Sequence, residues 1–457
     1  MSYIPNTDED RKSMLAKIGV ESIDDLFNSL PFTSRLQGTL NIPDRFDQVS
    51  LIKHFRSLSK KNVNADDIPC FMGAGIYDHY VPPTVGAIIG RSEFYTSYTP
   101  YQPELSQGTL QSIFEFQTLI CKLFGMDVAN ASMYDGATAL AEAVIMAADV
   151  TGRRTVVIPD TVNPMYRDVV ATYASHNNVA IRTIPAESGV ISRDVLQTEL
   201  DEDCAAVIIQ QPNFFGNFED ALAAREASIA SGSLLIACVD PISLGVTAPP
   251  GEYDADIAVA EGQSLGCPMG FGGPLLGLFT CKERFMRRLP GRIVGQTLDA
   301  SQKRAFVMTL RTREQDIRRE RATSNICTNE ALYALAATVY LATMGPTGME
   351  QVGHLCLQKA RYAAEQIGNV SGFSLVFPNA QTFKEFLVTV PGEAIKLSEF
   401  LLTRGVLGGF VTAKLIPECG ESMLFCVTEN RTRSEIDLLV ALLAEYSDNV
   451  SYDGGLP

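Results

Sequence analysis

The chain has 457 residues, of which 46% are apolar and 20% are charged, and its formal net charge is −16. This length exceeds one ordinary hydrophobic core and this apolar content excludes a disordered chain, so we predict a folded protein of at least two domains. The negative charge argues against a nucleic-acid partner, because phosphate backbones are bound by clustered Lys and Arg side chains.

Cysteine and histidine usage predicts a metal-free protein of a reducing compartment. Ten cysteines are scattered without a CxxC pair, and only four histidines occur. A zinc site needs closely spaced sulfur and nitrogen ligands, so we predict none. Free cysteines within apolar runs such as LLIACVD are typical of the cytoplasm, where we expect the protein. No stretch reaches the roughly 20 apolar residues of a membrane span, so no membrane partner is expected.

The pattern of apolar residues predicts three regions in chain order. Residues 1–65 are polar, with short amphipathic helical patterns, and we expect a helical arm that lies on another subunit. Over 66–330, short strands rich in Val and Ile alternate with helices. Nearly continuous apolar strands are buried on both faces, which predicts a large α/β domain with a mostly parallel sheet. Residues 331–457 begin with a long helix and continue as a small α+β domain.

Several long strings resemble one enzyme family. FMGAGIYDHYVPP, SEFYTSYTPYQPELSQGTLQSIFEFQTLICKLFGMDVANAS, RTREQDIRRERATSNICTNEAL and EGQSLGCPMGFGGP are similar to the amino-terminal half of glycine decarboxylase, the P-protein of the glycine cleavage system. The resemblance covers nearly the whole chain and implies the fold of type I enzymes that use pyridoxal phosphate (PLP). In some bacteria the two homologous halves of the P-protein are separate polypeptides, and this chain resembles the separate amino-terminal one.

The resemblance also predicts that the cofactor lysine is missing. PLP catalysis begins with a Schiff base between the cofactor aldehyde and a lysine amine. In the catalytic half of the family this lysine precedes a glycine run, and the matching string here places Gln263 at its position. An amide nitrogen is not nucleophilic, and no lysine occurs between Lys122 and Lys282. We therefore expect no catalytic residue in this chain and no PLP bound covalently to it.

Three further positions match cofactor-binding positions of the family without its chemistry. Asp160 stands about where a histidine stacks on the PLP ring, and a carboxylate does not stack. Asp240 matches the aspartate that meets the pyridine nitrogen, although it is read more simply as a residue that caps a strand end. Gly136 opens a predicted helix at the turn that holds phosphate in active relatives. We expect all three to be vestigial.

Two segments, a tyrosine-containing stretch at 95–101 and an arginine-rich stretch at 311–325, are candidates for contact with a partner or for lining a channel. Arginine suits desolvated interfaces and anionic groups better than lysine does, although most charge runs are solvated helix surfaces. The tyrosines are equally compatible with packing inside the chain. The candidate residues are Tyr95, Tyr98, Tyr101, Arg311, Arg313, Glu314, Arg318, Arg319, Thr323, Ser324 and Asn325.

The resemblance implies a non-catalytic subunit of a two-subunit glycine dehydrogenase (decarboxylating). A homologous subunit would bind PLP, decarboxylate glycine and transfer the aminomethyl group to the lipoyl arm of the H-protein, in a complex of two copies of each subunit. Two alternatives stay open. A free-standing PLP-dependent aminotransferase or lyase would need a Schiff-base lysine, and a non-enzymatic scaffold would not co-purify with a lysine-bearing homologue.

Overall fold

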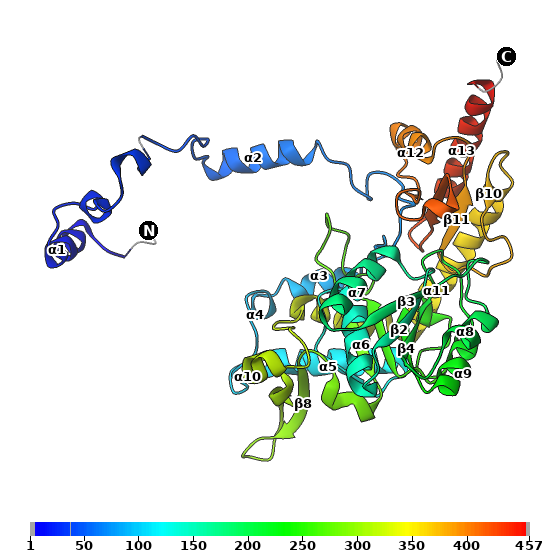
Figure 1. The fold of residues 1–457 in the computed structure, drawn as a ribbon. Coiled ribbons are helices and arrows are strands. Elements are labelled where there is room, and N and C mark those ends of the chain that lie inside the picture. Colours follow the sequence, from blue (N-terminus) through cyan, green and yellow to red (C-terminus); the bar gives the residue numbers. More distant parts are fainter. Residues whose placement is uncertain (1–4, 37, 454–457) are drawn as a thin grey trace. The chain divides into compact units, whose positions relative to one another are not determined.

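The computed structural model describes residues 5–36 and 38–453, and its contacts divide the chain into the units Met1–Val63 and Asn64–Pro457 (Figure 1). The helices of the first unit are α1 (Asp8–Ile18), η1 (Asp24–Phe27), η2 (Phe32–Ser34) and α2 (Gln48–Ser59). No described residue of this unit is buried, and large apolar side chains such as Phe32 and Phe55 are exposed. The described residues of this unit therefore form no hydrophobic core of their own.

The second unit is built on a seven-stranded sheet with the order β1-β7-β6-β5-β4-β2-β3. Its strands are β1 (Val128–Ala129), β2 (Thr155–Pro159), β3 (Ala180–Ile184), β4 (Cys204–Gln211), β5 (Leu234–Val239), β6 (Ile257–Glu261) and β7 (Gly277–Cys281). Strands β3, β2, β4, β5 and β6 are parallel, whereas β7 runs antiparallel to both of its neighbours. The predicted mostly parallel sheet is confirmed.

Both faces of this sheet are buried because alternate side chains of its strands enter two separate cores. In β4, Val207 belongs to one core and Ile208 to the other, as the two-residue period of a strand requires. Helices α6 (Gly136–Thr151) and α7 (Pro164–His176) cover one face. The opposite face is covered by α5 (Gln107–Phe124), α8 (Arg193–Glu199), α9 (Ala221–Ser231) and the first part of α11 (Ala331–Gly368).

Shorter elements flank the sheet. They are α3 (Pro83–Ile89), α4 (Ser92–Tyr95), η3 (Ser243–Gly245), η4 (Glu283–Arg288), η5 (Arg311–Arg313), α10 (Gln315–Arg318), η6 (Arg319–Arg321) and the hairpin of β8 (Ile293–Leu298) and β9 (Arg304–Thr309). Of the helices that the structure describes, none combines the length and apolar composition that a membrane crossing would need.

The carboxyl-terminal part is a four-stranded antiparallel sheet backed by helices. The sheet has the order β10-β11-β13-β12, and Gly345, with φ 61° and ψ −176°, interrupts α11 before that helix joins this part. Its elements are β10 (Ser374–Leu375), β11 (Glu385–Thr389), α12 (Ala394–Thr403), β12 (Phe410–Val411), η7 (Pro417–Cys419), β13 (Ser422–Cys426) and α13 (Arg433–Asp453). The second half of α11 packs with α12 and α13 in one core, so this part is the predicted small α+β layer.

Candidate functional site

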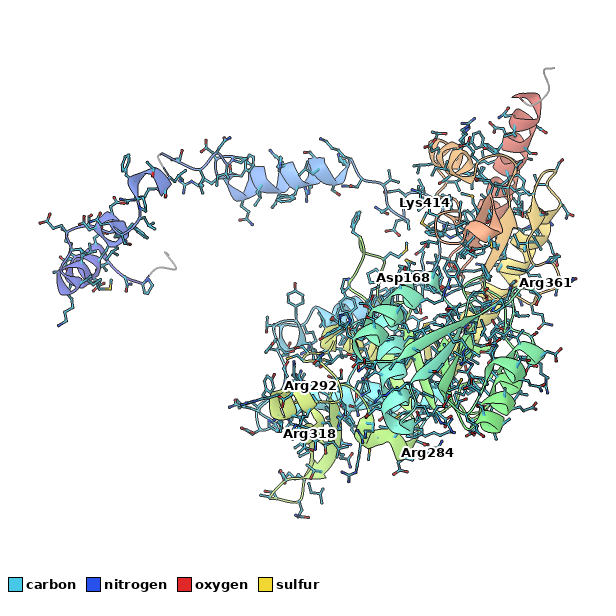
Figure 2. The ribbon with its side chains drawn as sticks, viewed as in Figure 1. Asp168, Arg284, Arg292, Arg318, Arg361 and Lys414 are labelled. Atoms are coloured by element: carbon cyan, nitrogen blue, oxygen red, sulfur yellow. The ribbon has the colours of Figure 1, made fainter. Side chains whose placement is uncertain are left out.

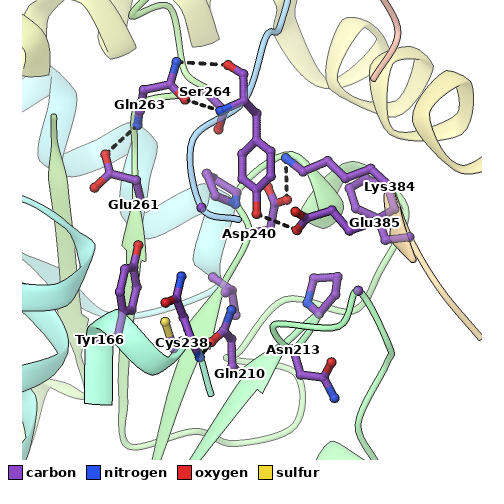
Figure 3. Close-up of a pocket in the computed structure, with 18 residues that line it drawn as sticks. Tyr166, Gln210, Asn213, Cys238, Asp240, Glu261, Gln263, Ser264, Lys384 and Glu385 are labelled. Atoms are coloured by element: carbon purple, nitrogen blue, oxygen red, sulfur yellow. Dashed lines mark hydrogen bonds and ion pairs between the residues drawn. The ribbon is translucent and has the colours of Figure 1, made fainter. Parts of the chain in front are cut away.

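A pocket lies at the carboxyl ends of the parallel strands, where open α/β sheets bind their ligands. Strand β4 supplies Gln210, the end of β5 supplies Asp240, and β6 supplies Glu261 (Figure 3). Residues from the start of β11 in the small sheet complete the wall. The large sheet and the small one therefore both contribute to the site.

Gln263 stands two residues beyond β6 and is almost fully buried. Its Oε1 accepts a hydrogen bond from the Tyr77 amide at 3.0 Å, and its Nε2 donates to the carbonyls of Tyr77, at 3.1 Å, and Cys267, at 2.6 Å. The amide thus joins the segment before α3 to the loop after β6. It has no free electron pair on nitrogen with which to attack a carbonyl.

Asp240 forms a buried ion pair that the sequence did not indicate. Lys384, 1% exposed, places its Nζ 2.6 Å from Asp240 Oδ2 (Figure 3). This Nζ also lies 2.9 Å from His79 Nε2. The same Nζ lies 3.3 Å from the centre of the Tyr77 ring. Burial is the largest single influence and would lower the pKa of Lys384, but the Asp240 carboxylate together with the nearby Cys426 and Cys356 outweighs it and raises the pKa above its ordinary value. Lys384 therefore stays an ammonium ion.

His79 connects this ion pair to the small sheet. Its Nδ1 lies 2.7 Å from Glu429 Oε2, and its Nε2 faces the Lys384 ammonium. An ammonium only donates, so Nε2 accepts and the ring proton sits on Nδ1. Among the described residues, His79, Cys356 and Glu429 form the one group with metal-ligand atoms within 4.8 Å of one another, but both ring nitrogens of His79 are already engaged.

Glu261 places a carboxylate at the amino end of α6. Its Oε2 accepts from the Gly136 amide at 2.9 Å, and its Oε1 accepts from the amides of Gln263 and Leu276, each at 2.9 Å. Burial raises the pKa of Glu261 to about 7 against the opposing effect of these donors. A Cβ at position 136 would come within 2.8 Å of the Glu261 amide nitrogen, so only glycine fits there.

Glu385, next to Lys384, holds the segment before α3. It accepts from the Ala74 amide at 2.6 Å and from the Tyr77 hydroxyl at 2.8 Å, and burial raises its pKa to about 7. The other reactive groups of the wall are inert. Burial raises the pKa of the Cys238 thiol to about 12, and no described residue is hydrogen-bonded to the Ser264 hydroxyl as a base. The described wall contains no activated nucleophile.

Comparison with known proteins gives one consistent result. The profile of the glycine cleavage system P-protein matches residues 1–443. This chain belongs to that P-protein family. The probable glycine dehydrogenase (decarboxylating) subunit 1 of Desulforamulus reducens is 49% identical over 447 residues, 98% of this chain and all of that protein. A crystal structure of glycine decarboxylase (P-protein), in inhibitor-bound form, matches with a TM-score of 0.89 at 41% identity, over 97% of this chain and 100% of that chain.

The P-protein resemblance and the type I PLP-enzyme fold predicted from the sequence are both confirmed. The structure of a sphingosine-1-phosphate lyase of Burkholderia pseudomallei matches with a TM-score of 0.67 at 12% identity, over 93% of this chain and 96% of the lyase chain. At this identity the likeness concerns the fold alone.

Like Gly136, Asp160 was predicted at a cofactor-binding position from the family resemblance and is not among the residues that line the pocket. It follows β2, is half-buried, and its amide donates to the Ile184 carbonyl at 3.0 Å. Burial raises the pKa of its carboxyl. The same loop reaches the pocket three residues later through Asn163.

The arginine segment of the P-protein signature is divided between buried and exposed side chains. Arg313 is buried, and its guanidinium donates to the carbonyls of Leu289, Gly291 and Leu310. Glu314, with its side chain 8% exposed, lies between two arginines, 3.6 Å from Arg292 and 3.9 Å from Arg311. Arg292 was missed by sequence reasoning because nothing in its local sequence marks it.

The other candidates differ in exposure. Thr323 and Ser324 are both half-buried, and the Ser324 hydroxyl donates to Glu142 of α6 at 2.8 Å. The exposed members are Arg318, Arg319 and Asn325 (Figure 2 labels Arg318).

Two of the three candidate tyrosines line a groove on the surface. Tyr95 and Tyr98 are 70% and 76% exposed and border this groove together with the start of α11. Tyr101 is exposed as well, but Arg292 Nη2 donates to its hydroxyl at 3.0 Å and the guanidinium lies over its ring. Tyr95 and Tyr98 are therefore free to meet another molecule, whereas Tyr101 is held in place.

Proposed function

We propose that this chain is the subunit of a two-subunit glycine decarboxylase that does not bind PLP, and that a homologous subunit carries the cofactor lysine. The complex converts glycine to CO2 and passes the aminomethyl group to the lipoyl arm of the H-protein. The names of the relatives, subunit 1 of a glycine dehydrogenase, support a partner subunit. The amide at Gln263, at the position where the resemblance expects a Schiff-base lysine, is the observation that most supports a catalytic partner.

A free-standing PLP enzyme would have to use Lys384 as its nucleophile. The ring nitrogen and the aldehyde are at opposite ends of the pyridine ring, and in type I enzymes the aspartate meets the nitrogen end. Here Lys384 Nζ touches the carboxylate of Asp240 itself. A ring bound to Asp240 would thus meet Lys384 at its nitrogen end rather than at its aldehyde end. The ion pair with Asp240 also keeps the Lys384 amine protonated.

We further propose that the partner covers the exposed tyrosine groove and the arm. Tyr95 and Tyr98 are large, exposed aromatic side chains of the kind enriched at interfaces. The unit Met1–Val63 exposes apolar side chains without a core of its own. Arg318 and Arg319 add charge for the same partner or for the H-protein. A complex of two copies of each subunit, in the cytoplasm, stays our prediction.

Co-expression with the lysine-bearing homologue tests the proposal. We expect the two chains to co-purify, and we expect glycine–bicarbonate exchange from the complex but not from this chain alone. The double variant Tyr95→Ala/Tyr98→Ala should weaken co-purification, whereas Leu402→Ala, which removes an exposed apolar side chain of α12, should not. Exchange by this chain alone, or full activity of the homologue without it, would contradict the proposal.

A further inference from the structure

We propose that the pocket is filled by charges of the chain itself: Lys384 replaces a cofactor ring at Asp240, and Glu261 replaces a cofactor phosphate at the amino end of α6. The consequence is that restoring a lysine at position 263 is not sufficient to make this chain bind PLP. This inference rests on the geometry of described residues and is independent of the partner subunit.

The first replacement satisfies the charge of Asp240. A PLP ring needs an acidic partner for its protonated nitrogen, and Asp240 stands at the strand end where such a partner is placed. Lys384 already supplies a positive charge there at 2.6 Å. A pyridinium that displaced it would leave a buried ammonium without its counter-ion, which is strongly unfavourable.

The surroundings of Lys384 are matched to an ammonium ion. Besides Asp240, it donates to His79 Nε2 and lies against the face of the Tyr77 ring. Acceptors and an aromatic face are the partners that a buried ammonium requires. Tyr77 is in turn fixed by Glu385 through its hydroxyl and by Gln263 through its backbone. The cation is thus held by three partners rather than by one contact.

The second replacement occupies the amides that a phosphate would use. Helix amino ends bind anions because their first N–H groups are unpaired and the helix dipole is positive there. At α6 the first of these groups, the Gly136 amide, already donates to Glu261. A phosphate placed there would lose that donor and would meet the Glu261 carboxylate, a charge of the same sign.

The side chains that fill the pocket also join its two walls. Lys384 directly precedes β11 and Glu385 begins it, so their bonds to Asp240 and Tyr77 tie the small sheet to the end of β5 and to the segment before α3. The former cofactor pocket thereby acts as a joint between the two sheets.

The test uses the full-length chain and three variants incubated with PLP at about pH 8, above the pKa of Glu261, so that this carboxyl is ionised. The variants are Gln263→Lys, Gln263→Lys/Lys384→Met and Gln263→Lys/Lys384→Met/Glu261→Ser. Absorbance near the visible and borohydride reduction followed by peptide mass mapping report a Schiff base at position 263. Circular dichroism confirms that each variant is folded.

We expect no pyridoxyl label at position 263 in the single variant and a clear label in the triple variant. PLP affinity should rise by about a hundredfold or more from the single to the triple variant, because like charges in contact and unpaired buried charges cost that much. A single variant that is labelled as well as the triple variant would overturn the proposal. So would a folded triple variant without label.

The wild-type chain provides a second test that does not depend on the folding of any variant. Lys384 should be labelled by PLP and borohydride far less than Lys396, whose side chain is 64% exposed. The variant Asp240→Asn should increase the labelling of Lys384, because the amide no longer holds the ammonium form. A wild-type Lys384 that reacts as readily as Lys396 would show that the pocket is not closed by this ion pair.

Discussion

Replacing Lys384 by methionine should destabilise the fold more than almost any other single change that keeps side-chain volume. The substitution removes an ammonium whose side chain is 2% exposed and leaves Asp240, 11% exposed, facing the pocket without a cation. Breaking a buried pair by removing one partner costs about 3–5 kcal/mol. We expect a loss near the lower end, about 3 kcal/mol, because the Asp240 side chain keeps some contact with solvent.

Urea unfolding followed by circular dichroism measures this loss as a lower midpoint at an unchanged slope. Lys396→Met is the matched control, since it breaks a surface pair with Glu393 and should cost less than about 0.5 kcal/mol. The pair Lys384→Met/Asp240→Asn should recover about 2 kcal/mol relative to the sum of the single losses. Strictly additive losses, or a Lys384→Met variant as stable as the control, would refute the buried ion pair.

Three further predictions concern pH, the arginine segment and the arm. The pKa of Glu261 is raised to about 7, so its stabilising effect is fully present below its unfolded value of about 4.3 and is lost as pH rises through about 7. Glu261→Gln should therefore reduce the slope with which the free energy of unfolding falls with pH, by up to about 1.4 kcal/mol per pH unit over this window. An unchanged slope would contradict the raised pKa of Glu261. Arg313→Lys should cost about 1–3 kcal/mol in urea unfolding, because an ammonium lacks the planar fork that reaches all three carbonyls, while Arg318→Lys should be neutral. Deleting residues 1–63 should leave the unfolding of the remaining chain unchanged and weaken co-purification with the lysine-bearing homologue; equal recovery would exclude the arm from the interface.

The sheet could be predicted from the sequence because its signal is local. The first six residues of β4 and all of β5 are continuous runs of buried apolar residues, and such runs indicate burial on both faces of a sheet. Gln263 and Asp240 were located by motif and strand position. Each of these predictions depends on residues that are close together in the chain.

The contacts that fill the pocket could not be predicted in this way. Lys384 meets Asp240 only because the small sheet packs against the carboxyl edge of the large one, and no local pattern encodes that contact. The absence of lysine between Lys122 and Lys282 pointed away from any amine in the pocket. Arg313 shows the same difficulty, since a charge run gives no sign that one of its members is buried.

The most direct test of the central claim is borohydride reduction of the assembled two-subunit complex, followed by mass mapping of peptides from both chains. We predict a pyridoxyl-lysine only in the homologous partner, with Lys384 and every other lysine of this chain unmodified. A stoichiometric pyridoxyl group on any lysine of this chain would contradict the claim that this chain does not bind PLP.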